Sequence, residues 1–96
     1  MEFDLGEIVG SDIQGHVAAN FFQKSLMSEI EGEKGIREIV INLSGVSYVD
    51  SMTLGALVSF RSDMKKRGKE VILKNPRGGV RKKIQIIRFD KLFKIT

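Results

Sequence analysis

Two hydroxyl side chains, Ser51 and Thr53, stand at the start of a predicted helix. Ser51 is expected to be the helix N-cap, because its hydroxyl can accept a hydrogen bond from the free backbone N–H groups of the first turn. A phosphate on Ser51 would bring roughly −1.5 to −2 charges to the positive end of the helix dipole, so the fold should tolerate it. Asp50 would repel that phosphate and any partner carboxylate. Asp50-Ser51 therefore predicts a hydroxyl that can switch a binding surface off.

Other residue types that carry chemistry lack the partners they would need. The lone histidine, His16, opens an amphipathic helix without a second histidine, and the chain has no cysteine. A metal site, a Ser–His dyad and a thiol nucleophile therefore each lack residues that they require. Gly78-Gly79 precedes a helical pattern, but no complete nucleotide-binding glycine motif surrounds it, which favours a plain turn. We predict no catalytic, metal or cofactor site, and no enzyme.

The charge of the chain is divided between its two halves. Residues 1–50 carry three basic and nine acidic side chains, a net charge of −6. Residues 51–96 carry thirteen basic and three acidic side chains, a net charge of +10. The basic runs Lys65–Arg67 and Arg81–Lys83 raise nucleic-acid binding as an alternative function. We disfavour it, because such runs are usually solvated helix faces and only Phe60 and Tyr48 are near enough for base stacking. An acidic protein partner would suit the same face.

Length and hydropathy set limits on the architecture. A chain of 96 residues allows one domain, which we place at residues 1–96. Its apolar runs are far shorter than the roughly 20 residues that cross a bilayer, and the acidic N-terminus is unlike a secretory signal. We therefore expect a cytoplasmic protein without a membrane segment.

Apolar spacing predicts the elements that position Ser51. Glu7–Val9 is the only strand candidate near the N-terminus, and His16–Glu31 has the three- and four-residue spacing of an amphipathic helix. Next come a β-branched strand at Arg37–Leu43, a helix at Met52–Arg67 and a strand at Glu70–Lys74. These three elements form a βαβ unit with a right-handed crossover, which predicts an α/β domain.

The end of the chain is expected to add two smaller elements. Gly68 suits a left-handed residue that ends the helix before it. A third helix is predicted from about Gly79 to Ile87, and Leu92–Ile95 is predicted as an edge strand.

One long motif extends from the predicted strand at Arg37–Leu43 into the helix at Met52–Arg67. Residues Val40–Ser51 read Val-Ile-Asn-Leu-Ser-Gly-Val-Ser-Tyr-Val-Asp-Ser, and Leu54–Leu57 read Leu-Gly-Ala-Leu. This resembles the STAS domain of bacterial anti-sigma factor antagonists, whose motif is approximately Asp-Leu-Ser-Gly-Val, an aromatic and an aliphatic residue, then Asp-Ser-Ser-Gly-Leu-Gly-Ala-Leu. The similarity continues through Leu73–Pro76 to Phe89–Phe93, and so covers about residues 36–95.

The resemblance implies a STAS-like α/β fold, with a mixed, mainly parallel four- to five-stranded sheet and helices packed on one side. It also implies partner switching. In that family, the unphosphorylated antagonist sequesters an anti-sigma factor that is also a serine kinase, which frees the sigma factor for transcription. Phosphorylation of the antagonist breaks this complex, and a PPM-type serine phosphatase restores it.

Carried over by position, the phosphoacceptor is Ser51. The segment that the resemblance assigns to partner binding comprises Asp50, Ser51, Met52, Thr53, Leu54 and Gly55. Gly55 is expected to permit close approach of a neighbouring backbone.

The chain departs from the family pattern at two places. Met52 and Thr53 replace the second Ser and the Gly, so Thr53 is an alternative acceptor, although local bonding of its hydroxyl to the backbone is the simpler expectation. The N-terminal strands are abbreviated and the usual C-terminal helix is missing, so either the sheet is smaller or a homodimer partner completes its edge. A STAS scaffold or ligand-sensing module that is never phosphorylated remains the alternative function.

Overall fold

A computed structural model of the chain describes residues 1–9, 12–13, 15–31 and 35–96. The elements follow in this order: β1 (Glu2–Asp4), α1 (Leu5–Val9), β2 (Asp12–Ile13), α2 (Gly15–Glu31), β3 (Glu38–Asn42), β4 (Tyr48–Val49), α3 (Ser51–Lys66), β5 (Glu70–Lys74), α4 (Gly78–Ile86), the 3-10 turn η1 (Phe89–Lys91) and β6 (Lys94–Ile95).

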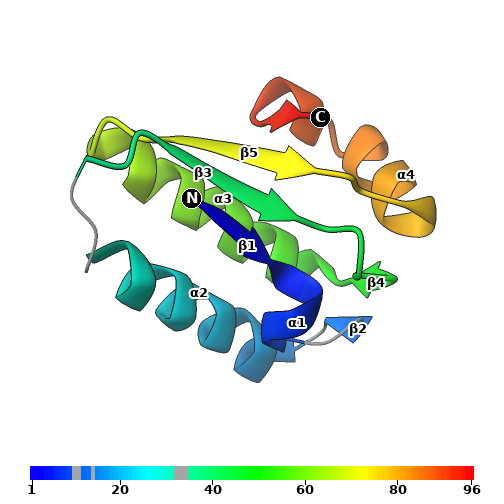
Figure 1. Ribbon diagram of the computed structural model, residues 1–96. Coiled ribbons are helices and arrows are strands. Elements are labelled where there is room, and N and C mark those ends of the chain that lie inside the picture. The colour runs from blue at the N-terminus through cyan, green and yellow to red at the C-terminus, as the bar shows by residue number, and fades with distance from the viewer. Residues whose placement is uncertain (10–11, 14, 32–34) are drawn as a thin grey trace.

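The prediction is a mixed, mainly parallel sheet of four or five strands, and the described strands form a four-stranded sheet whose pairs are parallel. Its order is β1-β3-β5-β6, and β2 and β4 make a separate parallel pair. In the sheet, Val40 lies between Glu2 on β1 and Ile72 on β5. Figure 1 shows α2 and α3 together on one side of the sheet, with α4 beyond the end of β5. The prediction of a mainly parallel α/β domain with helices on one side is confirmed.

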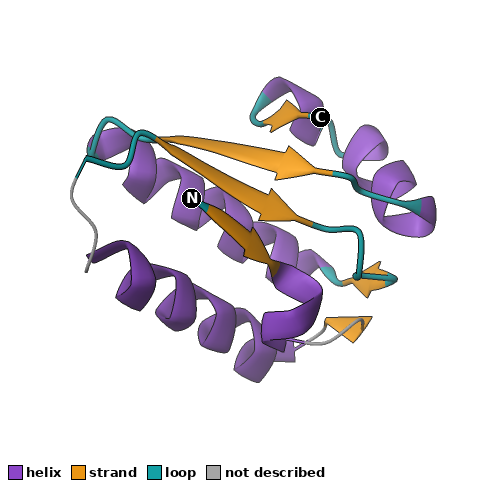
Figure 2. Cartoon of the chain, viewed as in Figure 1, coloured by secondary structure: helices purple, strands orange, loops and turns teal. Residues whose placement is uncertain are grey.

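The βαβ unit of β3, α3 and β5 forms the centre of the core. Ile39, Ile41 and Leu73 are fully buried on the strands, and Leu57 and Phe60 on α3 are 1% exposed. These side chains recur every two residues on β3 and every three on α3, so each element turns a continuous apolar side toward the others. Figure 2 shows α3 crossing beneath the two strands that it connects. Strand β4 ends at Val49 and α3 begins at Ser51, so the start of α3 directly follows the carboxyl end of β4.

The prediction of a strand at Glu7–Val9 is wrong, because these residues belong to α1. The first strand is β1, five residues earlier, and Phe3 is its buried residue. Leu5 is completely buried and Ile8 packs against the core. Residues three apart lie on one side of a helix, whereas in a strand they would point to opposite faces, so burying both side chains favours the helix.

Two glycines allow the chain to pass closely over itself between α1 and the turn after β3. A Cβ added to Gly6 would lie 2.9 Å from both the carbonyl carbon and the carbonyl oxygen of Gly45. Only a residue without a side chain fits such an approach. At the far end of α3, Gly68 adopts φ +75°, which confirms it as the left-handed residue that ends the helix.

The predicted C-terminal elements are present with shifted ends. Helix α4 begins at Gly78 and buries Val80 and Ile84. Strand β6 is shorter than expected and pairs with β5 at the edge of the sheet. Phe89 and Phe93 stack with ring centroids 5.3 Å apart and anchor this end of the chain in the core.

Candidate functional site

The start of α3 is capped by Asp50. Its Oδ1 accepts a hydrogen bond of 2.9 Å from the backbone N–H of Thr53, and its backbone is extended with φ −92° and ψ 173°. Ser51 is therefore the first residue of the helix rather than its N-cap, and that prediction is wrong. Both residue types are good caps, and the carboxylate provides the charged acceptor that interacts more favourably with the helix dipole.

The hydroxyl-bearing side chain of Ser51 is exposed to solvent. Met52 is 39% exposed, and Gly55, one turn after Ser51, is exposed as well. Residues four apart on a helix are surface neighbours, so Ser51, Met52 and Gly55 form one continuous outer surface at the start of α3. We call these three residues the outer face of α3.

The other members of the predicted segment have different surroundings. Thr53 is completely buried and Leu54 is 3% exposed, so both belong to the core, while Asp50 is half-buried at the cap. The expectation that the Thr53 hydroxyl bonds to the backbone is wrong, because within the described part of the chain its Oγ1 is buried without a hydrogen-bond partner. An unpartnered buried hydroxyl costs stability, and its burial shields it from an enzyme.

Gly55 does not serve the close approach that was expected of it. A Cβ built on this residue would meet no atom within 4 Å among the described residues. The tight contact between backbones lies instead at Gly6 and Gly45. The spacing of residues along the chain gave no signal for that contact, because it joins two segments nearly forty positions apart.

Helix α4 braces the strand that leads into the site. Lys83 donates a hydrogen bond of 2.8 Å from Nζ to the carbonyl oxygen of Val49, and the same nitrogen lies 5.1 Å from the centroid of the Tyr48 ring. A cation at this distance from an aromatic face is attracted to it. Sequence reasoning treated Lys83 only as part of a basic run and missed this contact, since no local pattern pairs it with β4.

The basic runs are exposed except for the half-buried Lys83, but the aromatic rings beside them are not arranged for stacking. Lys65, Lys66 and Arg67 are exposed at the end of α3, whereas Phe60 is only 1% exposed. Tyr48 is 45% exposed and is already covered on one face by Lys83. A buried Phe60 cannot stack on a base, which weakens the case for nucleic-acid binding.

The remaining candidates are His16 and the Gly78-Gly79 turn. His16 lies in α2, and its side chain falls outside what the structure describes. Within the described residues, no cluster of three or more His, Cys, Asp or Glu side chains could hold a metal ion. Gly78 begins α4 with φ +51°, after an N-cap residue, Arg77, that makes no side-chain capping bond.

Helix length and apolarity bear on membrane insertion. None of the helices in the ranges that the structure describes is both long and apolar enough to cross a bilayer.

The fold and the site define a small parallel α/β domain with an exposed hydroxyl at a capped helix start. Residues 13–96 match the STAS domain. The chain is also similar in structure to a protein of Thermotoga maritima described as a "putative anti-sigma factor antagonist". The TM-score is 0.75 at 26% sequence identity, over 88% of this chain and 72% of the other. This chain belongs to the STAS domain family.

Proposed function

We propose that this chain is a cytoplasmic anti-sigma factor antagonist, a binding module rather than an enzyme, that sequesters an anti-sigma factor and so regulates transcription by a sigma factor. Membership of the STAS domain family and the similarity to the Thermotoga maritima protein support this function. The single observation that carries the proposal is the solvent exposure of Ser51 at the first position of α3, beside the capping carboxylate of Asp50.

In this proposal Ser51 is the phosphoacceptor and the anti-sigma factor is its kinase. The positive end of α3 lowers the cost of adding negative charge at its first residue, so phosphorylation should leave the fold intact. The outer face of α3 would nevertheless change from a neutral surface to one that carries two adjacent negative groups, the phosphate and Asp50. A partner interface that fits the neutral surface loses affinity, because the phosphate repels partner carboxylates and because removing water from the phosphate costs free energy.

The proposal also requires a way back to the binding state. A PPM-type serine phosphatase would remove the phosphate from Ser51, which is reachable because the side chain is exposed. Thr53 is the alternative acceptor, but its hydroxyl is completely buried, so it would have to leave the core first.

The direct test is phosphorylation in vitro by the anti-sigma factor kinases encoded in the same genome. We expect one phosphate per chain, located at Ser51 by mass spectrometry. Ser51→Ala should abolish incorporation, and Thr53→Val should preserve it. Incorporation that persists in Ser51→Ala, or its absence with kinases that phosphorylate their own known antagonists, would contradict the proposed switch.

A second function is favoured by the side chain that follows Ser51. Met52 is 39% exposed and is bulkier than the serine of the family motif. A scaffold or ligand-sensing STAS module that is never phosphorylated would use the same outer face of α3 for constant binding. In that case Ser51→Asp would leave the affinity for the anti-sigma factor unchanged.

A further inference from the structure

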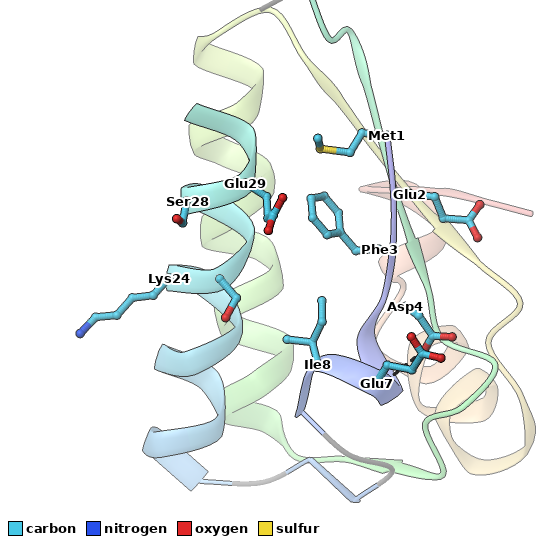
Figure 3. A pocket seen from close by; sticks show the side chains of 10 residues that line it. Met1, Glu2, Phe3, Asp4, Glu7, Ile8, Lys24, Ser28 and Glu29 are labelled. Carbon is cyan, nitrogen blue, oxygen red and sulfur yellow. Dashed lines mark hydrogen bonds between the residues drawn. The ribbon is translucent and has the colours of Figure 1, made fainter. Parts of the chain in front are cut away.

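A groove of about 830 Å³ lies between β1 and α2, and none of its lining residues belongs to the segment from Asp50 to Gly55. Its apolar floor comes from Phe3, which is 8% exposed, and from the half-buried Ile8. Figure 3 shows both side chains in the space between β1 and α2, with Glu29 of α2 turned into the same space. The groove is therefore a second surface, separate from the outer face of α3.

One wall of the groove is an open edge of the sheet. Strand β1 is the terminal strand in the order β1-β3-β5-β6. The carbonyl oxygen of Met1 accepts a hydrogen bond of 2.8 Å from the N–H of Val40, so the backbone groups of Met1 face β3. Because these groups alternate in direction along a strand, the N–H and C=O of Glu2 point away from β3, toward the outside of the sheet. They are available to pair with an added strand.

The charge around this edge is strongly acidic. Four carboxylates, those of Glu2, Asp4, Glu7 and Glu29, line the groove against two ammonium groups, that of Lys24 and the N-terminal group of Met1, which donates to the carbonyl oxygen of Glu38. Figure 3 shows that Glu2 and Asp4 point to the side of β1 opposite to Phe3. The two faces next to the edge therefore differ: the face toward α2 has the apolar floor of Phe3 and Ile8 with Glu29 beside it, and the other face carries Glu2 and Asp4.

We propose that this edge and groove bind an extended segment of a partner protein in which basic and apolar residues alternate. Neighbouring strands turn corresponding side chains to the same face of a sheet, so alternate residues of the added strand would lie on opposite faces. Its apolar side chains would cover Phe3 and Ile8 on the α2 side. Its basic side chains would lie beside Glu2 and Asp4.

Charge selects this occupant over a second copy of the chain. Two β1 strands paired across a two-fold axis would place the acidic side chains of one copy beside those of the other, and like charges opposite each other destabilise a strand pair. Lys74 Nζ lies 3.2 Å from Oε1 of Glu2, so a basic side chain of the added strand would share the Glu2 carboxylate with Lys74 and would have Asp4 beside it.

The test titrates the ¹⁵N-labelled full chain with the peptide Ac-Lys-Val-Lys-Val-Lys-Val-NH2 and records the NMR shifts of the chain. We expect saturable shifts at residues 2–4 and at Ile8, with an affinity that falls as salt is raised. Glu2→Lys should weaken binding by about tenfold. Asp63→Lys makes the same charge change on an exposed residue of α3 outside the groove, and should leave the affinity nearly unchanged.

Three results would overturn the proposal. The first is the absence of shifts at β1. The second is equal binding of Ac-Glu-Val-Glu-Val-Glu-Val-NH2 or of the unpatterned Ac-Val-Val-Val-Lys-Lys-Lys-NH2. The third is concentration-dependent self-association that shifts β1 without peptide, which would assign the edge to a second copy. Because the groove is separate from Ser51, Ser51→Asp should leave peptide affinity unchanged, and this keeps the test independent of the proposed switch.

Discussion

Helices α1 and α3 both follow a short strand, and both begin after an aspartate whose carboxylate accepts a backbone N–H three residues later. Asp4 Oδ1 accepts from Glu7 at 3.2 Å, and Asp50 Oδ1 accepts from Thr53 at 2.9 Å. The glycines in the two helices differ, however. Gly6 lies against the backbone of Gly45, whereas Gly55 has open space around it.

The difference distinguishes a helix start that packs against the rest of the chain from one that stays exposed to solvent. In α1 the glycine is required for the chain to pass over the turn after β3, so Gly6 serves a packing contact inside the molecule. In α3 the fold does not require a glycine at position 55, and Ser51, Met52 and Gly55 all remain exposed. A small residue on an exposed helix surface leaves room for a partner to approach.

The largest stability effect in this comparison is expected at Gly6. Gly6→Ala would place a Cβ 2.9 Å from two backbone atoms of Gly45, and backbone cannot move aside as a flexible side chain can. We expect the free energy of unfolding to fall by about 1–3 kcal/mol, measured by urea denaturation. An unchanged urea midpoint would show that α1 and the turn are not in close contact.

The two aspartate caps provide the next test. Asp50→Ala removes a part-buried cap from a sixteen-residue helix and should lower the free energy of unfolding by about 1–2 kcal/mol. Asp4→Ala removes a longer, exposed bond from a five-residue helix, and should cost less than half of that. Asp50→Asn retains a capping oxygen and serves as the control. Equal losses for the two alanine variants would remove the distinction between the caps.

The buried hydroxyl of Thr53 predicts a gain in stability. Thr53→Val replaces the unpartnered Oγ1 with a methyl group of similar shape, which should raise the free energy of unfolding by about 1 kcal/mol in thermal or urea denaturation. A loss of stability in Thr53→Val would mean that the hydroxyl has a hydrogen-bond partner in solution.

The smallest stability effect, and the most informative for binding, is expected at Gly55. Gly55→Ala removes backbone entropy from the unfolded chain at a helical position with free space, so stability should rise by about 0.5–1 kcal/mol. Affinity for the anti-sigma factor, measured by calorimetry, should fall in the same variant if a partner packs on the outer face of α3. A rise in stability with unchanged affinity would place the partner elsewhere.

The central part of the fold could be predicted from sequence because its signals are local. The β-branched residues of β3, the apolar spacing of α3 and the run in β5 each identify one element, and the connection between them fixes a parallel pair. The resemblance to the STAS domain then predicts Ser51 as the phosphoacceptor, and this role stays a prediction. None of this required knowledge of contacts between distant segments.

The errors arise where distant contacts or competing local choices decide the outcome. Glu7–Val9 reads as a strand nucleus, but burial of Leu5 and Ile8 makes it helical. Asp50 and Ser51 are both good N-caps, and sequence alone cannot choose between adjacent candidates. The Gly6–Gly45 approach and the bond from Lys83 to Val49 join segments that only the folded chain brings together.

The central claim is that charge on Ser51 controls partner binding through the outer face of α3. The most direct measurement compares the affinity of the anti-sigma factor for the unmodified chain, the Ser51-phosphorylated chain and Ser51→Ala, by calorimetry under identical salt. We predict that phosphorylation weakens binding by about 100-fold or more, and that Ser51→Ala stays within about threefold of the unmodified chain. Equal affinities for the phosphorylated and unmodified chains would contradict the account.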